Sequence, residues 1–179
     1  LYNFMFRIFK STTICSSRPF AHFRYHIPDQ GTETVNSGLL NQLTLIGIKE
    51  IMKEDYSWLK IELIEKLVKP LALLIPGVSK KGHYKQWQSY KFAEIAKYLD
   101  NLNFTICVVG TKEDIKSVLP IVKSCKNIIN KIDQSPPEVI YSLALKSKII
   151  FSNDTGPGHI ASLAKNNFIW IVNDNNVSR

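Results

Sequence analysis

Apolar runs that alternate with amphipathic stretches organise the chain from Pro70 onward. Runs of consecutive apolar residues are typical of strands buried on both faces, and they occur at 71–75, 104–109, 128–129, 148–151 and 168–172. The segments between them carry apolar residues at helical spacing and predict helices. These helices start at a Ser89 cap, at a capping box over 111–114, at Pro136-Pro137 and just after residue 155. The last of them is predicted to reach Lys165. Residues 34–45 also predict a helix. Alternating strands and helices predict an α/β fold with a parallel sheet wrapped by helices.

The most informative segment is 152–161, Ser-Asn-Asp-Thr-Gly-Pro-Gly-His-Ile-Ala, which joins a predicted strand to a predicted helix. The unpaired N–H groups and positive dipole at a helix start favour a phosphate or another anion. Gly156 and Gly158 would leave room for close backbone approach to a ligand, and Pro157 removes an N–H that would otherwise lack a partner. The polar side chains expected around this spot are Asp154, Thr155 and His159.

Three loops should meet at the carboxyl edge of the sheet, where open α/β sheets bind their ligands: 77–87, 110–114 and 152–159. The first loop carries Ser79, Lys80, Lys81, His83 and Lys85. A positioned ammonium stabilises negative charge on a departing diphosphate, although a loop lysine can equally be a solvated surface residue. We expect Lys85 to be the phosphate contact, because Trp87 should anchor the start of the next helix and restrain it.

Charge and composition narrow the classes of partner. The net charge is +8, but the Lys and Arg residues are scattered, without the dense basic block typical of nucleic-acid binders. We therefore expect an anionic small molecule or a membrane surface, and no nucleic acid. Cys15, Cys107 and Cys125 form no CxxC pair, as expected of reduced structural thiols in a cytosolic protein. The sequence predicts no transmembrane helix, no signal peptide, no cofactor and no metal site.

Five segments follow one another in order: Pro76 to Ser79, Lys85-Gln86-Trp87, Phe92 to Ala96, Val108 to Gly110 and Ser152 to Ala161. This array resembles glycosyltransferase family 9, the ADP-heptose:lipopolysaccharide heptosyltransferases, over about 71–172. The resemblance implies a GT-B fold, in which two Rossmann-like domains face each other across a cleft. Residues 1–65 would then end the acceptor domain and residues 66–179 would form most of the donor domain, so we expect a fragment.

The resemblance also implies a reaction and its participants. The enzyme would transfer a heptose or similar sugar from a nucleotide-diphosphate donor such as ADP-heptose to lipopolysaccharide core or a related lipid-linked glycan. Transfer would invert the anomeric carbon and need no metal. The enzyme would work in the cytoplasm, in peripheral contact with the inner membrane.

Carried over residue by residue, the resemblance puts Lys85 and the Ser79 hydroxyl against the diphosphate and Glu113 near the nucleoside. The phosphates and sugar would be held by Asp154, Thr155, Gly156, Gly158 and His159. The chain departs from the family pattern at Gln88, where Pro is usual, and the 77–85 loop is slightly long. The family's base would lie before Leu1, so no catalytic base is assigned and residues 1–179 are expected to be inactive alone.

Other interpretations stay open at this point. Asp154-Thr155-Gly156 is also the triplet of aspartic proteases, which place it in an all-β setting. Further alternatives are a different GT-B enzyme, such as a nucleotide-sugar epimerase, a family member that uses another sugar, or an inactive nucleotide-binding remnant. The basic and aromatic residues Arg18, His22, Arg24, Tyr25 and His26 could face an anionic acceptor or form ordinary packing and solvated surface.

Overall fold

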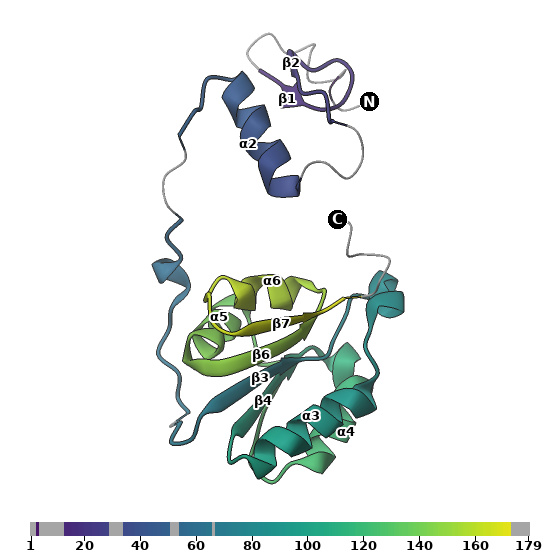
Figure 1. Ribbon diagram of the computed structural model, residues 1–179, viewed down its shortest axis with the longest axis vertical. Coiled ribbons are helices and arrows are strands. Elements are labelled where there is room, and N and C mark those ends of the chain that lie inside the picture. The colour runs from purple at the N-terminus through teal and green to yellow at the C-terminus, as the bar shows by residue number, and fades with distance from the viewer. Residues whose placement is uncertain (1–2, 4–12, 29–33, 51–53, 66, 173–179) are drawn as a thin grey trace. The chain divides into compact units, whose positions relative to one another are not determined.

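The computed structural model describes residues 3, 13–28, 34–50, 54–65 and 67–172. The chain divides into two compact units, Leu1–Glu54 with Asn175–Arg179, and Asp55–Asp174. In the first unit the short strands β1 (Cys15–Ser16) and β2 (Phe23–Arg24) pair in parallel. Helix α2 (Val35–Leu45) follows (Figure 1). The Thr34 hydroxyl caps this helix by accepting from the Ser37 N–H at 3.2 Å. The helix predicted over 34–45 is confirmed.

The second unit is built on a five-stranded parallel sheet with the order β5-β4-β3-β6-β7. Its strands are β3 (Leu71–Ile75), β4 (Thr105–Gly110), β5 (Ile128–Ile132), β6 (Ser147–Asn153) and β7 (Phe168–Ile171). The predicted α/β class with a Rossmann-like parallel sheet is confirmed. Strand β6 extends beyond the predicted 148–151, because Ser152 and Asn153 are still in register with Trp170 and Ile171 of β7. The direction of strand order reverses between β3 and β6.

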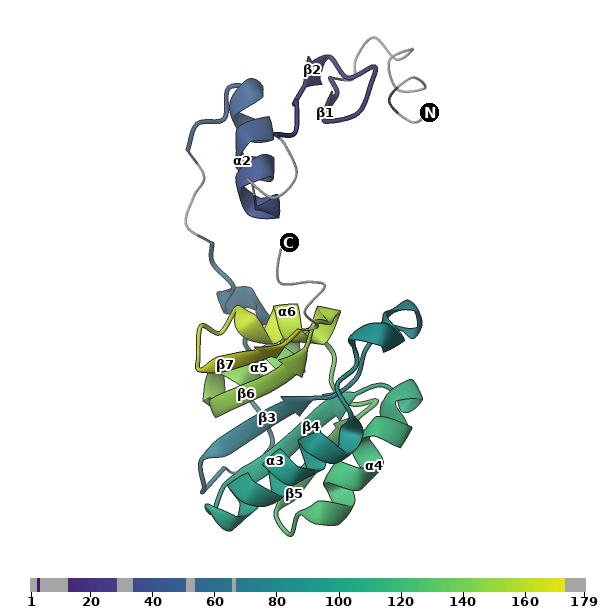
Figure 2. The same cartoon turned by 45° about the vertical axis from the view of Figure 1, so that its right-hand side comes forward.

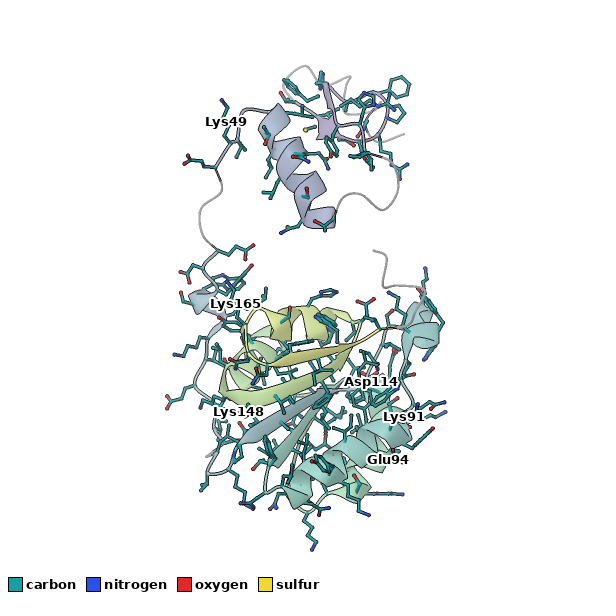
Figure 3. All side chains as sticks on the ribbon, in the orientation of Figure 1. Lys49, Lys91, Glu94, Asp114, Lys148 and Lys165 are labelled. Atoms are coloured by element: carbon teal, nitrogen blue, oxygen red, sulfur yellow. The ribbon has the colours of Figure 1, made fainter. Side chains whose placement is uncertain are left out.

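Within the described residues, the sheet is covered by the helices α3 (Ser89–Asn101), α4 (Ile115–Ser124), α5 (Pro137–Lys146) and α6 (Gly156–Ser162). Side chains alternate along β3, where every residue is at most 1% exposed. Ala72 and Leu74 pack in a core with α3 and α4, while Leu71, Leu73 and Ile75 pack in a second core with α5 and α6. Figure 2 shows how these helices lie against the strands. Charged side chains such as Glu94, Lys148 and Lys165 are exposed on the outside of this unit (Figure 3).

Two predicted helix boundaries were wrong. Ser89 does not cap α3 but is its first residue, and Gln88 takes the cap position without a side-chain hydrogen bond. Helix α6 ends at Ser162 instead of Lys165, because the N–H groups of Leu163, Ala164 and Lys165 bond only three residues back and Lys165 has a left-handed φ of 55°. Among the described residues, no helix combines the length and apolar character needed to cross a membrane.

A strap over residues 57–65 packs on the α5 side of the sheet. It begins with the 3₁₀ turn η1 (Ser57–Leu59) and buries Leu59 and Leu63 to 8% and 9% exposure. The Ile61 N–H donates to Ser142 Oγ at 2.9 Å, and Glu65 forms an ion pair with Lys131 of β5. Residues 55–65 thus lie within the second compact unit, while the division into acceptor and donor domains stays a prediction.

The three cysteines are free, as expected. Cys107 is buried in β4, and burial raises the pKa of its thiol to about 12. A thiol with so high a pKa is a packing residue, because the thiolate is the reactive form.

Candidate functional site

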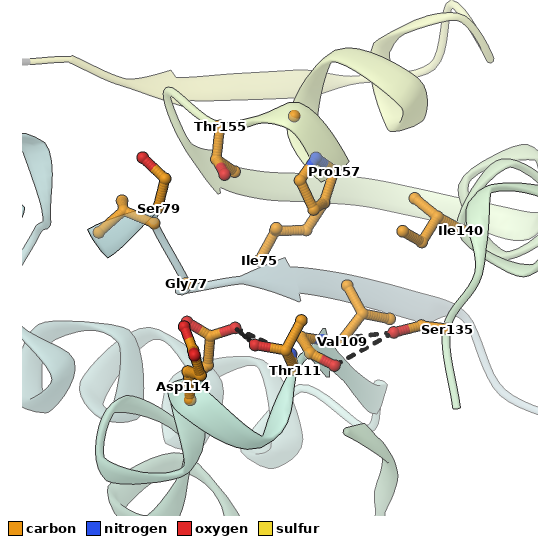
Figure 4. Close-up of a pocket in the computed structure, with 14 residues that line it drawn as sticks. Ile75, Gly77, Ser79, Val109, Thr111, Asp114, Ser135, Ile140, Thr155 and Pro157 are labelled. Atoms are coloured by element: carbon orange, nitrogen blue, oxygen red, sulfur yellow. Dashed lines mark hydrogen bonds between the residues drawn. The ribbon is translucent and has the colours of Figure 1, made fainter. Parts of the chain in front are cut away.

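A cavity of about 390 Å³ opens at the carboxyl edge of the sheet, beside the point where the strand order reverses (Figure 4). The loops after β3, β4 and β6 all contribute to it, so the predicted meeting of the three loops is confirmed. Its apolar lining includes Ile75, Val109, Ile140 and Pro157, and its polar lining includes Ser79, Thr111, Ser135 and Thr155. A mostly apolar cavity of this size with a few hydroxyls and carboxylates at its edge has the make-up of a small-molecule site.

One side of the cavity is shaped by the capping box that begins α4. Asp114 accepts hydrogen bonds from the Thr111 N–H at 2.8 Å and from the Thr111 hydroxyl at 3.0 Å, which confirms the predicted capping box. The 3₁₀ turn η3 (Lys112–Asp114) contains this box and leads directly into α4. The carboxylate lies so close to Gly77 that a Cβ there would stand 2.5 Å from Asp114 Cγ. Asp114 is a lining residue that was not predicted from the sequence, although a capping carboxylate opposite a Pro-Gly strand end was a usable signal.

Next to the cavity, an ion pair joins two of the loops. Lys85, at the end of the 3₁₀ turn η2 (Lys80–Lys85), places its Nζ 2.6 Å from Asp154 Oδ2, and the two side chains are 23% and 26% exposed. His159 Nε2 lies 3.5 Å from the other carboxylate oxygen, Oδ1. The hydrogen bond from Lys85 is the main cause that lowers the pKa of Asp154 below its usual range. All three residues were predicted from the sequence as site residues, but their contacts with one another were not.

The buried amide of Asn153 holds this arrangement together. Its Oδ1 accepts from the Trp87 N–H at 3.1 Å, and its Nδ2 donates to the Pro76 carbonyl at 2.8 Å. Trp87 in turn packs edge-on against Phe92 of α3, with ring centroids 5.3 Å apart, and is the predicted anchor of that helix. Asn153 is fully buried. It ties the end of β6 to the end of β3 and so fixes the loop of Lys85 relative to Asp154, a role that the sequence did not reveal.

The sequence-predicted site residues fall into two neighbouring groups. Ser79, Glu113, Thr155 and Gly156 line the cavity. Lys85, Asp154 and His159 form the ion-pair cluster. Glu113 sits on the rim and pairs with Lys80 at 2.6 Å, both side chains being mostly exposed.

The two glycines of the turn behave differently. A Cβ at Gly156 would meet no atom within 4 Å, which leaves the open approach that we expected. A Cβ at Gly158 would lie 2.4 Å from Ser152 Oγ and 2.9 Å from Trp170 Cζ3, inside the protein. The expectation that Gly158 leaves space for a ligand is therefore wrong, because this glycine allows α6 to pack on β6 and β7. Helix α6 has only seven residues, so its dipole adds little to anion binding.

Elsewhere the structure gives less support for a site. Arg18, His22, Arg24 and His26 are exposed, while the hydroxyl of the half-buried Tyr25 accepts from Asn41 at 3.3 Å. Their role toward an acceptor stays a prediction. Within the described part of the chain, no group of three or more His, Cys, Asp or Glu side chains is placed to hold a metal ion.

An open parallel sheet with a cavity at its switch point is the arrangement of Rossmann-like α/β domains, which bind their ligands beyond the carboxyl ends of the strands. The chain belongs to glycosyltransferase family 9 (heptosyltransferase), whose family model matches residues 46–169. The resemblance seen in the sequence is thereby confirmed. The parallel sheet also excludes the aspartic protease alternative, which requires an all-β setting.

Solved structures share the fold. A family 9 glycosyltransferase from Veillonella parvula DSM 2008 superposes with a TM-score of 0.65 at 17% identity, over 86% of this chain and 47% of that one. The ADP-heptose LPS heptosyltransferase II of E. coli superposes with a TM-score of 0.52 at 22% identity, over 57% of this chain and 32% of that one. The matched region thus spans about half and about a third of the lengths of these proteins. No curated protein sequence matches the chain significantly.

Proposed function

We propose that this chain supplies the donor-binding part of an inverting glycosyltransferase that moves a heptose or similar sugar from ADP-heptose to lipopolysaccharide core or a related lipid-linked glycan. The observation that carries the proposal is the apolar cavity at the strand switch point, with the Lys85–Asp154 pair directly beside it. Such a site provides an apolar cavity for the nucleotide base and, beside it, a positioned cation for phosphate.

The nucleoside would occupy the cavity. Ile75, Val109 and Pro157 give the apolar walls that a flat base needs. Glu113 on the rim is an acceptor for ribose hydroxyls, for which it would exchange its exposed contact with Lys80. The hydroxyls of Ser79 and Thr155 lie on the lining where the phosphates would leave the cavity.

The diphosphate would then meet Lys85. In the reaction, an acceptor hydroxyl oxygen attacks the anomeric carbon, its proton passes to a base, and the bond from that carbon to the diphosphate oxygen breaks with inversion. The negative charge grows on the departing diphosphate, where a preorganised ammonium is most effective. Asp154 and the anchored Trp87 hold Lys85 beside the cavity. We assign no residue of this chain as the base.

A lipid-linked acceptor would bring the enzyme to the cytoplasmic face of the membrane. The net charge of +8 favours contact with anionic lipid there. The basic residues 18–26 are the candidates for an acceptor contact in this proposal.

The test compares two lysines of the same turn. Lys85→Ala should weaken ADP-heptose binding about tenfold to hundredfold, the usual loss for one charge-assisted hydrogen bond, in an NMR titration of the 179-residue chain. In an enzyme with both cleft-facing domains, the same change should slow transfer about 10²–10³-fold. Lys81→Ala is the matched control, since Lys81 is exposed and should have little effect. Equal and small effects of the two changes would overturn the proposal.

His159 offers a second check at the sugar end. Its ring is 68% exposed and packs on Trp170 at a centroid distance of 4.9 Å, so its removal should leave the core intact. His159→Ala should weaken ADP-heptose binding while unfolding stays cooperative. Full donor affinity in this variant would restrict His159 to a surface role.

A further inference from the structure

The ion pair between Lys85 and Asp154 affects the binding of any ligand that carries phosphate. Lys85 Nζ lies 2.6 Å from Asp154 Oδ2, so the carboxylate neutralises the ammonium, and both side chains are about three-quarters buried. Lys85 from η2 contacts one carboxylate oxygen of Asp154, and the imidazole of His159 from α6 lies 3.5 Å from the other. A diphosphate that engages Lys85 therefore competes with Asp154 for the same ammonium.

The consequence depends on what the diphosphate carries. A free nucleoside diphosphate draws Lys85 toward itself and brings negative charge near a carboxylate that loses much of its compensation, which is costly in a partly desolvated place. A sugar-loaded donor also brings hydroxyl groups, which can donate hydrogen bonds to Asp154 in place of the ammonium. A site that binds such hydroxyls discriminates strongly against an analogue without them, because the polar group of the protein is then left without a hydrogen-bond partner.

We propose that Asp154, through its ion pair with Lys85, makes this site select the sugar-loaded nucleotide over the free nucleoside diphosphate. This inference rests on the proposed function, since it takes the donor to bind at this edge of the sheet. Selectivity here is the difference between the affinities for the two ligands. Asp154 strengthens the binding of the sugar-loaded nucleotide and weakens the binding of the free diphosphate. After sugar transfer the remaining diphosphate faces an uncompensated Asp154, so the same residue favours product release.

The experiment measures two affinities in two variants. The 179-residue chain, Asp154→Asn and Asp133→Asn are each titrated with ADP and with ADP-heptose by NMR. Asp154→Asn keeps the side-chain shape and removes the charge. ADP should bind about three- to tenfold more tightly to it, because a nearby repulsive charge is lost. ADP-heptose should bind about tenfold more weakly, because charge-assisted hydrogen bonds from the sugar are lost.

Asp133→Asn is the matched control for net charge. Asp133 follows β5 at the same edge of the sheet and pairs with Lys112 at 3.0 Å, with 43% of its side chain exposed. Asp133→Asn removes the same charge as Asp154→Asn and should change the affinity for each ligand by less than about twofold. Its left-handed φ of 62° suits Asn as well as Asp.

Opposite shifts for the two ligands in Asp154→Asn alone support the inference. Unchanged affinities, or shifts of both ligands in the same direction, overturn it while leaving the proposed function standing. If the unsubstituted chain binds neither ligand, the proposed function fails and the inference fails with it. Thermal unfolding checks that Asp154→Asn is folded, and Asp154→Ser repeats the comparison if it is not.

Discussion

Gly156 and Gly158 stand two positions apart in the same turn and have different surroundings. Gly156 is exposed, with open space where a Cβ would lie. Gly158 is buried, and its missing Cβ is what allows Ser152 and Trp170 to approach the start of α6. The first glycine is therefore available to a ligand and the second serves packing, although the sequence presents them as equivalent.

Replacing each glycine by alanine separates these roles. Gly158→Ala should lower the free energy of unfolding by about 1–3 kcal/mol, the usual cost of overpacking, despite the better helix propensity of alanine. Gly156→Ala should stay within about 0.5 kcal/mol of the unsubstituted chain, as is usual at exposed positions. Urea unfolding followed by circular dichroism measures both. Equal stabilities would show that the surroundings of Gly158 yield to a methyl group at no cost.

At the scale of elements, the loops are held by polar side chains that reach across strand ends. Asn153 links β6 to β3 and α3, while Asp100 at the end of α3 accepts from the Lys126 N–H at 2.8 Å and so fixes the start of β5. On the opposite face the strap ends in the Glu65–Lys131 pair, in which the two side chains are 20% and 17% exposed. The first two contacts fix the segment before α3 and the start of β5, and the third fixes the strap to β5.

The strap contact should make stability depend on pH. The hydrogen bond from Lys131 is the main cause that lowers the folded-state pKa of Glu65 below its usual value of 4.5. The ionised carboxylate therefore stabilises the fold above that pH, and its contribution is lost as pH falls through the lower folded-state pKa. Glu65→Gln should cost about 1 kcal/mol at pH 7, and the cost should shrink in acid.

Urea unfolding at a series of pH values measures this difference. Glu62→Gln is the matched control, because Glu62 is exposed on the same strap. A cost for Glu65→Gln that stays constant into acid would mean that the pair contributes by packing alone.

At the scale of the whole molecule, the strap belongs to the same compact unit as the sheet. Leu63 joins the core formed with α5, and Leu59 is buried where η1 contacts that helix. The family model begins at residue 46, so the matched region also takes in the strap. In a chain of two units, such a strap connects one unit to the other while it completes the core of the second.

Two truncated chains test this organisation. A chain that starts at Asp55 should keep the stability of the second unit, since Leu59 and Leu63 remain. A chain that starts at Leu67 should lose several kcal/mol, because each fully buried leucine contributes about 1.5–3 kcal/mol. Thermal and urea unfolding compare the two. Equal stability would favour a boundary between the domains near residue 65, as the sequence predicts.

The sequence by itself determined the parallel α/β sheet, the family and the convergence of three loops, because apolar runs, helical spacing and motif order are properties of neighbouring residues. It missed the beginning of α3 and the end of α6 by a few residues, where backbone contacts decide the boundary. Only the tertiary structure decided which polar groups meet. Lys85 and Asp154 are 69 positions apart and Asn153 lies 77 positions from Pro76, so their contacts depend on how the strands align side by side.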